Sequence, residues 1–142
     1  MKEIIYTVEG LLPETVVIKV RKQLQISEDL DTEVDRAAKT YGFYAVLAEK
    51  AETRYQKIKF ACETWIAETE ATAHSERCRE KLKAYTEAQM KAHVRSQAKY
   101  RAFQIKLIRF DEHRRVLKII AKAFELKKDL IQTKAANRRR ED

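Results

Sequence analysis

The chain has 142 residues, which is enough for one domain, and it contains only two glycines and one proline. With turn-forming residues so scarce, a compact β or α/β domain is not expected, and the predicted fold is all-α, a long helical hairpin or coiled-coil-like bundle. The 44% apolar and 37% charged content favours long amphipathic helices over a disordered chain.

The net charge of +8 comes from the second half, because residues 1–72 carry 10 basic and 13 acidic side chains and residues 73–142 carry 20 and 9. A polyanionic partner is therefore expected at the second half. Nucleic acid is the commonest such partner, and an acidic membrane surface or an acidic protein are the alternatives.

An N-terminal segment, residues 1–26, precedes the helical part of the chain. Residues 3–8 are β-prone and predict a short strand that ends at Gly10. Because an isolated strand needs a partner, a single strand here could pair with another copy of the chain. Valines after Pro13 predict a short helix to about Gln25, although the same valines would suit a strand equally well.

A helical domain is expected over residues 27–142, and its first element is a long helix at about 31–70. Ser27 or Asp31 is the expected N-cap, followed by acidic residues in the first turn. Gly42 lies outside the apolar seam and should cost roughly 1 kcal/mol without ending the helix. The seam keeps a three-four spacing typical of coiled coils: Val34, Ala37, Tyr41, Tyr44, Ala48, Ala51, Tyr55, Ile58, Cys62 and Trp65.

A connector at about 71–86 follows, where the apolar spacing fails and mixed charge is dense. It is expected to be exposed and mobile, with a helical conformation as the alternative. Thr86 and Gln89 then have the spacing of a capping box, which predicts a short helix at about 87–95. The last helix is expected at about 97–136, and the polar tail from Asn137 is expected to fray.

Two apolar rows run along this last helix, roughly 150° apart on its surface. Two rows suit a helix that touches a neighbour on each side, as in an oligomeric ring of C-terminal helices, or a central helix buried by its own chain. Both architectures stay open. The candidate oligomerisation residues of the first row are Tyr100, Phe103, Leu107, Phe110, Leu117 and Phe124, and those of the second are Ile105, Ile119, Leu126 and Leu130. A heptad ladder between the rows, including His113, Ile120 and Lys127, would face the lumen of such a ring.

No catalytic constellation is visible, so we expect no enzyme, no cofactor and no metal. His74, His93 and His113 lie far apart without ligand companions, and no glycine-rich phosphate loop is present. Cys62 and Cys78 have no CxxC spacing and are expected to be reduced, as in the cytosol. The apolar runs are too short for a membrane span, and no signal peptide is expected, so the predicted location is cytoplasmic.

Two basic clusters are candidates for nucleic-acid binding. The first, with Tyr55 and Phe60 interleaved, comprises Lys50, Arg54, Lys57 and Lys59 on the long helix. Its alternative interpretation is an ordinary solvated helix face of mixed charge. The second comprises Arg77, Arg79, Lys81 and Lys83 in the connector, with Lys91 beyond it. Since phosphates need positive charge more than fixed geometry, a flexible basic strap would serve, but a merely exposed connector explains the same residues.

The acidic-alanine helix start and paired aromatics within residues 24–44, and the stretches at 85–94 and 100–132, resemble parts of the UvsY-type recombination mediators of tailed phages. Leu24–Tyr44 (LQISEDLDTEVDRAAKTYGFY) is similar to the opening of that family, with an acidic-alanine helix start followed by paired aromatics. Tyr85–Val94 (YTEAQMKAHV) and the stretch from Tyr100 to AFELKKDLIQ at 123–132 are similar to its closing helix. The likeness spans about residues 24–138, and residues 4–20 have no clear counterpart in the family.

The resemblance implies a phage protein, acting in the host cytoplasm, that binds single-stranded DNA. Such a protein would help to load a RecA-like recombinase onto DNA covered by single-strand-binding protein, as a homo-oligomeric ring without catalysis. The family's basic motif on the first long helix looks similar to Lys57 and Lys59, but Ala61 stands where a further basic residue would be expected.

Two other functions remain open on the sequence. One is a non-enzymatic coiled-coil scaffold or adaptor, or a phage assembly factor, whose basic half meets an acidic protein partner. The other is a regulator that binds duplex DNA, although the chain lacks the short turn between compact helices that such a protein uses for recognition.

Overall fold

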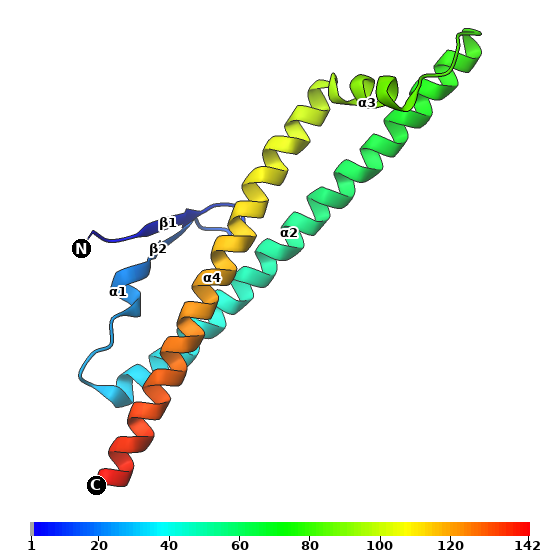
Figure 1. Ribbon diagram of the computed structural model, residues 1–142. Helices are drawn as coiled ribbons and strands as arrows, with labels where there is room; N and C mark the ends of the chain where they lie inside the picture. Colours follow the sequence, from blue (N-terminus) through cyan, green and yellow to red (C-terminus); the bar gives the residue numbers. More distant parts are fainter. Residues whose placement is uncertain (1) are drawn as a thin grey trace. The chain divides into compact units, whose positions relative to one another are not determined.

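The computed structural model describes residues 2–142 (Figure 1). In chain order the elements are β1 (Ile5–Val8), β2 (Val16–Lys19), α1 (Val20–Leu24), α2 (Leu30–Arg79), α3 (Glu87–Arg95) and α4 (Ala98–Glu141). Long helices and a short N-terminal strand were predicted from the sequence, and both are confirmed.

The N-terminal strand finds its partner within the chain, so the prediction that it pairs with another copy is wrong. β1 pairs antiparallel with β2, with Tyr6 opposite Ile18 and Val8 opposite Val16. Gly10 adopts φ 80° in the connecting turn, a conformation that side chains other than glycine disfavour. The helix expected from Pro13 onward is correspondingly shorter, because the β-branched residues 16–18 form β2 and only Val20–Leu24 is helical.

Helix α2 begins after a different cap from the ones predicted. The carboxylate of Asp29, rather than Ser27 or Asp31, accepts the Thr32 backbone N–H at 3.2 Å and the Thr32 hydroxyl at 2.7 Å. These hydrogen bonds lower the pKa of the Asp29 carboxyl below its usual value. The cap therefore satisfies a backbone donor at the helix start with a charged group.

Helix α2 extends to Arg79, whereas the sequence predicted an end near residue 70. Residues 71–79 contain no Gly or Pro, and Ala73 is buried, so the weakened apolar spacing does not interrupt the helix. The predicted capping box is confirmed: the Thr86 hydroxyl accepts the Gln89 backbone N–H at 3.2 Å, and the Gln89 side chain accepts the Thr86 N–H at 3.0 Å. Helix α4 continues through Arg138–Arg140, so the tail expected to fray is helical to Glu141.

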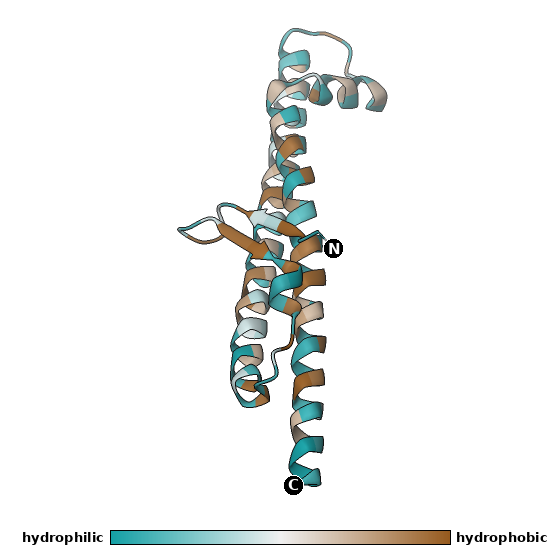
Figure 2. Cartoon of the chain, turned by 90° about the vertical axis from the view of Figure 1, so that its left-hand side faces the viewer, coloured by the Kyte–Doolittle hydropathy of each residue, from teal (hydrophilic) through white to brown (hydrophobic). Residues whose placement is uncertain are grey.

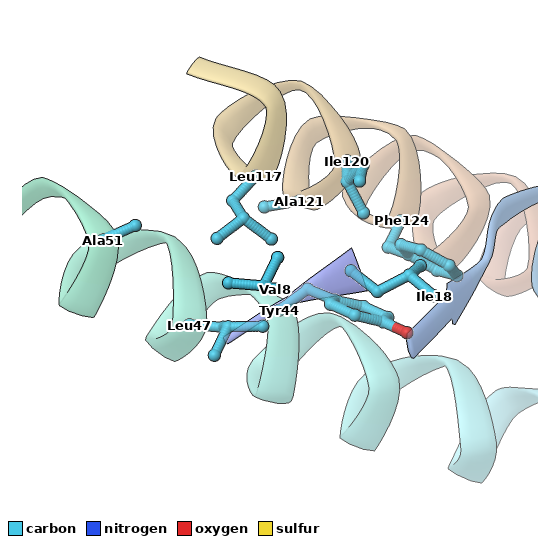
Figure 3. Packing of buried hydrophobic residues seen from close by; sticks show 9 residues of the cluster. All are labelled: Val8, Ile18, Tyr44, Leu47, Ala51, Leu117, Ile120, Ala121 and Phe124. Carbon is cyan, nitrogen blue, oxygen red and sulfur yellow. The ribbon is translucent and has the colours of Figure 1, made fainter. Parts of the chain in front are cut away.

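The chain forms two compact units. The first contains the N-terminal residues to Glu52 together with Glu112–Asp142, and the second contains Thr53–Asp111. The first unit has a continuous apolar core in which Phe124 stacks on Tyr44 with ring centroids 4.6 Å apart (Figure 3). Val8 and Ile18 from the hairpin pack against Leu47 of α2 and Leu117 of α4 in the same cluster. Four residues of the seam predicted for α2 therefore face this core, namely Tyr41, Tyr44, Ala48 and Ala51, and the seam residues from Tyr55 onward belong to the second unit.

The N-terminal segment is fastened to the first unit by polar contacts as well as by its apolar residues. The Glu3 carboxylate accepts the Arg21 and Lys22 backbone N–H groups at 2.7 and 2.9 Å, which caps the start of α1. The Tyr44 hydroxyl donates to the Gln23 side-chain carbonyl, while burial raises the pKa of that phenol. Lys127 of α4 donates to the Gln23 backbone carbonyl at 2.7 Å.

The second unit has a thinner core. Cys62 and Ala73 of α2 and Val94 of α3 are its buried apolar residues within the described chain. Trp65 of α2 contacts Phe103 of α4, with ring centroids 5.8 Å apart. Burial raises the pKa of the Cys62 thiol, and the neighbouring Glu63 carboxylate raises it further, so this thiol is an unreactive core group.

Candidate nucleic-acid interface

Three of the basic residues predicted on α2 share one helix face, because Lys50, Arg54 and Lys57 recur at i, i+4 and i+7, and Lys59 lies off that face. Lys57 and Lys59 are both exposed, but two helical positions place them roughly 200° apart around the axis. Arg54 is half-buried, and its guanidinium carbon lies 4.1 Å from the centroid of the Phe110 ring, so it is engaged within the second unit. Lys50 is exposed on the part of α2 that belongs to the first unit.

Lys59 also has acidic surroundings. It lines a groove of the second unit together with Glu63 and Asp111, and Tyr55 lines the same groove. Phe60 is 70% exposed, as an aromatic platform for a base would require. Within this cluster Arg54 is thus engaged with Phe110 and Lys59 lies near acidic side chains, which leaves Lys50 and Lys57 exposed on the shared face.

The connector residues lie close together because Arg77 holds the connector in place. Its Nε and Nη2 atoms donate to the Lys83 carbonyl at 2.8 and 2.6 Å, and its guanidinium carbon lies 4.3 Å from the Tyr85 ring centroid. Tyr85 in turn stacks on His93 of α3, with ring centroids 5.6 Å apart and an interplanar angle of 23°. These contacts give the connector a defined conformation, and its predicted mobility stays a prediction.

We refer to residues 77–95 as the basic segment, since they carry six basic and two acidic side chains. Arg79, Lys81 and Lys83 are exposed, and none of them forms an ion pair with any residue in the range 2–142. Lys91 is also exposed and pairs with Glu87 at 3.3 Å. An exposed ion pair of this kind contributes little, so the segment presents excess positive charge to solvent.

The backbone at the end of α2 forms a tight helix stop. The Leu82 N–H donates to the Arg77 carbonyl at 2.9 Å, and the Lys81 N–H donates to the Cys78 carbonyl at 3.1 Å. This is the hydrogen-bond pattern of a Schellman motif, in which the residue after the cap takes a left-handed conformation. Lys81 occupies that position with φ 55°, the one positive φ of a residue other than glycine within residues 2–142. Leu82, next to it, is 49% exposed.

The two apolar rows of α4 have different environments. In the first row, Leu117 and Phe124 are buried in the first unit, and Phe103 and Phe110 face Trp65 and Arg54 in the second. Tyr100 and Leu107 of that row are half-buried. The large residues of the second row are exposed: Ile105 by 68%, Ile119 by 69%, Leu126 by 59% and Leu130 by 48%. Figure 2 shows hydrophobic positions interspersed with hydrophilic ones along the long helices. The first row is thus occupied within the chain, and the second is available for a neighbour.

A shallow apolar groove lies beside Ile119 in the first unit. Ala45 and Ala48 of α2 and Ala121 of α4 line it, with Tyr41. The exposed isoleucine and a groove lined by alanines are thus neighbours on one chain.

The heptad ladder between the rows does not line an open surface in the first unit. The N-terminal hairpin covers it: His113 meets the Tyr6 ring edge-on at 6.1 Å, and Ile120 packs in the cluster that contains Val8 and Ile18. Lys127 is bound to Gln23 and Glu33. Residues 4–20, which had no assigned role in the sequence, therefore cover this side of α4.

Among residues 2–142, no three His, Cys, Asp or Glu side chains are grouped as a metal ion would require, and no helix is sufficiently long and apolar to traverse a bilayer. No protein-family model matches the chain, and neither the search of curated proteins nor that of solved structures gave a match.

The sequence analysis missed the contacts that order the basic segment. Tyr85 and His93 were not recognised as a stacked pair, although both flank the capping box, which was the one local signal for their positions. The positive φ of Lys81 has no sequence signal, because glycine or asparagine would normally mark such a position.

Proposed function

We propose that this protein is a single-stranded-DNA-binding recombination mediator that helps to load a RecA-like recombinase onto DNA covered by single-strand-binding protein. The observation that carries the DNA-binding part is the exposed, unpaired positive charge of Arg79, Lys81 and Lys83 in an ordered connector. Loading of the recombinase rests on the resemblance of Leu24–Tyr44 and Tyr85–Val94 to UvsY-type mediators. The protein would act in the host cytoplasm, with no catalytic step of its own.

Self-association through the second apolar row of α4 is part of this proposal. Ile119 and the neighbouring groove lined by Ala45, Ala48 and Ala121 give one surface both a projecting side chain and small residues that can receive one. Two copies of such a surface are complementary to each other, as in knobs-into-holes packing. A second copy of this chain is therefore the proposed occupant. This contact uses the same surface on both copies and so joins two chains, and the ring that the resemblance implies would need a further contact between such pairs. Association of copies would bring several basic segments onto one DNA strand.

The test is a fluorescence-anisotropy titration of the full chain with labelled oligo-dT across a salt series. Neutralisation of several phosphates predicts affinity that falls linearly on a log–log plot, with a slope of roughly −0.7 per phosphate contact on a single strand. Duplex DNA of equal length serves as competitor, and it should displace the single strand poorly. Absence of binding at low salt would remove the proposal. Capture of only protein partners after nuclease treatment would favour a scaffold that binds an acidic protein.

A further inference from the structure

The lysine at the end of α2 stands where a helix stop favours glycine. Lys81 follows the cap residue of a Schellman motif and has φ 55°, in the left-handed region where the Cβ atom of an L-residue is crowded. Backbone strain of this sort often marks a functional position. A charged side chain therefore occupies a position where glycine would adopt the backbone conformation with less strain.

The residues beside Lys81 are exposed to solvent, and two of them are positively charged. Arg79 and Lys83 are exposed on either side, without ion pairs in the described chain, and Leu82 is 49% exposed between the lysines. Arg77 does not share this availability, because its guanidinium is committed to the Lys83 carbonyl and the Tyr85 ring. One arginine thus orders the main chain, and its neighbours remain available to bind a ligand.

We propose that the turn 79–83 is the phosphate-binding site of the protein, with Lys81 as its central contact and Leu82 apposed to a base or sugar of single-stranded DNA. This inference rests on the proposed function and deepens it, since it places the principal contact in the basic segment rather than on Lys50, Arg54, Lys57 and Lys59 of α2. Fixing the turn beforehand lowers the conformational entropy lost on binding, so three charges on an ordered turn are more effective than three on a free strap.

The experiment separates charge from backbone strain with three variants of the full chain. Lys81→Gly removes both, Lys81→Gln removes only the charge, and Lys81→Arg keeps both. Lys39→Gln, an exposed lysine of α2 in the first unit, is the matched control for loss of one charge elsewhere. Oligo-dT affinity across a salt series and the thermal unfolding midpoint are measured for each.

We expect Lys81→Gly and Lys81→Gln to bind oligo-dT about fivefold more weakly at 0.1 M salt, with the salt slope smaller by about 0.7. Lys81→Arg and Lys39→Gln should bind as the unaltered protein does. Lys81→Gly should also raise the unfolding midpoint by about 3 °C, because it relieves the left-handed strain. Higher stability together with weaker binding is a combination that a purely structural lysine would not produce.

Three results would overturn the inference. If the unaltered protein binds oligo-dT but Lys81→Gly and Lys81→Gln bind equally well, this site is wrong and the proposed function stands. If Lys81→Gln lowers the unfolding midpoint without changing affinity for oligo-dT, the role of the lysine is instead to stabilise the C-terminal end of α2 through the helix dipole. If the unaltered protein binds vesicles of anionic lipid but not oligo-dT, the turn docks on a membrane surface, and the proposed function fails as well.

Discussion

Lys127 of α4 places its ammonium group 3.4 Å from the Glu33 carboxylate of α2, with 9% and 2% of the two side chains exposed. The same ammonium donates to the Gln23 carbonyl of α1 at 2.7 Å, and Arg36 lies 3.7 Å from the other Glu33 oxygen. One buried ion pair therefore joins α1, α2 and α4 within the first unit. Buried charges without partners are costly, so removal of either group would leave the other poorly compensated.

Lys127→Met should lower the free energy of unfolding by about 3 kcal/mol, because it leaves the Glu33 carboxylate buried with Arg36 as its remaining charge partner. The double variant Glu33→Leu/Lys127→Met should lose less than the sum of the two single changes, since no charge is left uncompensated. Urea unfolding followed by circular dichroism measures both. The control is Lys122→Met, whose exposed pair with Glu125 should contribute less than about 1 kcal/mol. If Lys122→Met lowered the free energy of unfolding as much as Lys127→Met does, a special role for the buried pair would be contradicted.

Gly42 offers a stabilising substitution in α2. It lies in the interior of the helix, and a Cβ atom added there would meet nothing within 4 Å. Gly42→Ala should therefore raise the free energy of unfolding by about 1 kcal/mol, because alanine restricts the unfolded chain without a clash. Gly10→Ala is the matched control, and it should be destabilising, because the hairpin turn holds Gly10 at φ 80°. Thermal unfolding distinguishes the two, and a loss of stability in Gly42→Ala would disprove this account of the site.

The cap of α2 makes stability depend on pH. The Thr32 hydroxyl and backbone N–H lower the pKa of the Asp29 carboxyl from its ordinary 3.8. A carboxyl whose folded-state pKa is depressed contributes stability above its unfolded-state pKa and loses it as the pH falls through the folded-state value. Asp29→Ala should therefore be less stable than the unaltered protein at neutral pH, and the difference should shrink below about pH 4. Asp29→Asn, which keeps a capping oxygen without the charge, is the control and should show a smaller loss at neutral pH.

Local signals in the sequence predicted those parts of the fold that depend on near neighbours. Thr86 and Gln89 specify the start of α3, and the three-four seam through Tyr44 and Ala51 specifies the buried face of α2. Contacts between distant residues were not predictable in this way. The valines of 16–20 suit a strand or a helix, and pairing with β1 decides in favour of a strand for 16–19.

In the candidate site too, local signals were predictable from the sequence and contacts between distant residues were not. The sequence located the basic residues of the connector, because charge density is a compositional signal. It did not show that Arg77 reaches the Lys83 carbonyl or that Lys81 takes a left-handed conformation, since both depend on how the chain turns back at the end of α2 (Figure 1). It did not separate the two rows of α4 either, because burial of Leu117 and exposure of Ile119 depend on where α2 and the hairpin pack.

The exposed row of α4 can be tested apart from DNA binding. Ile119 and Leu126 are 69% and 59% exposed in the first unit, so neither contributes much to its core. Ile119→Asp/Leu126→Asp should leave the unfolding midpoint within a few degrees of the unaltered value, because surface changes usually alter stability by less than about 0.5 kcal/mol. Charge in the contact surface should nevertheless prevent association with a second copy.

Multi-angle light scattering gives the readout. The unaltered protein should have a multiple of the 16.7 kDa chain mass, and the double aspartate variant should have the mass of one chain. Gln132→Asp is the control, since it adds a negative charge at an exposed α4 position that lies roughly 140° around the helix from Ile119, and it should associate normally. If the unaltered protein is already a single chain across its concentration range, the exposed row does not mediate self-association. The oligomeric part of the proposal would then be withdrawn, whereas DNA binding by the basic segment would stand on its own test.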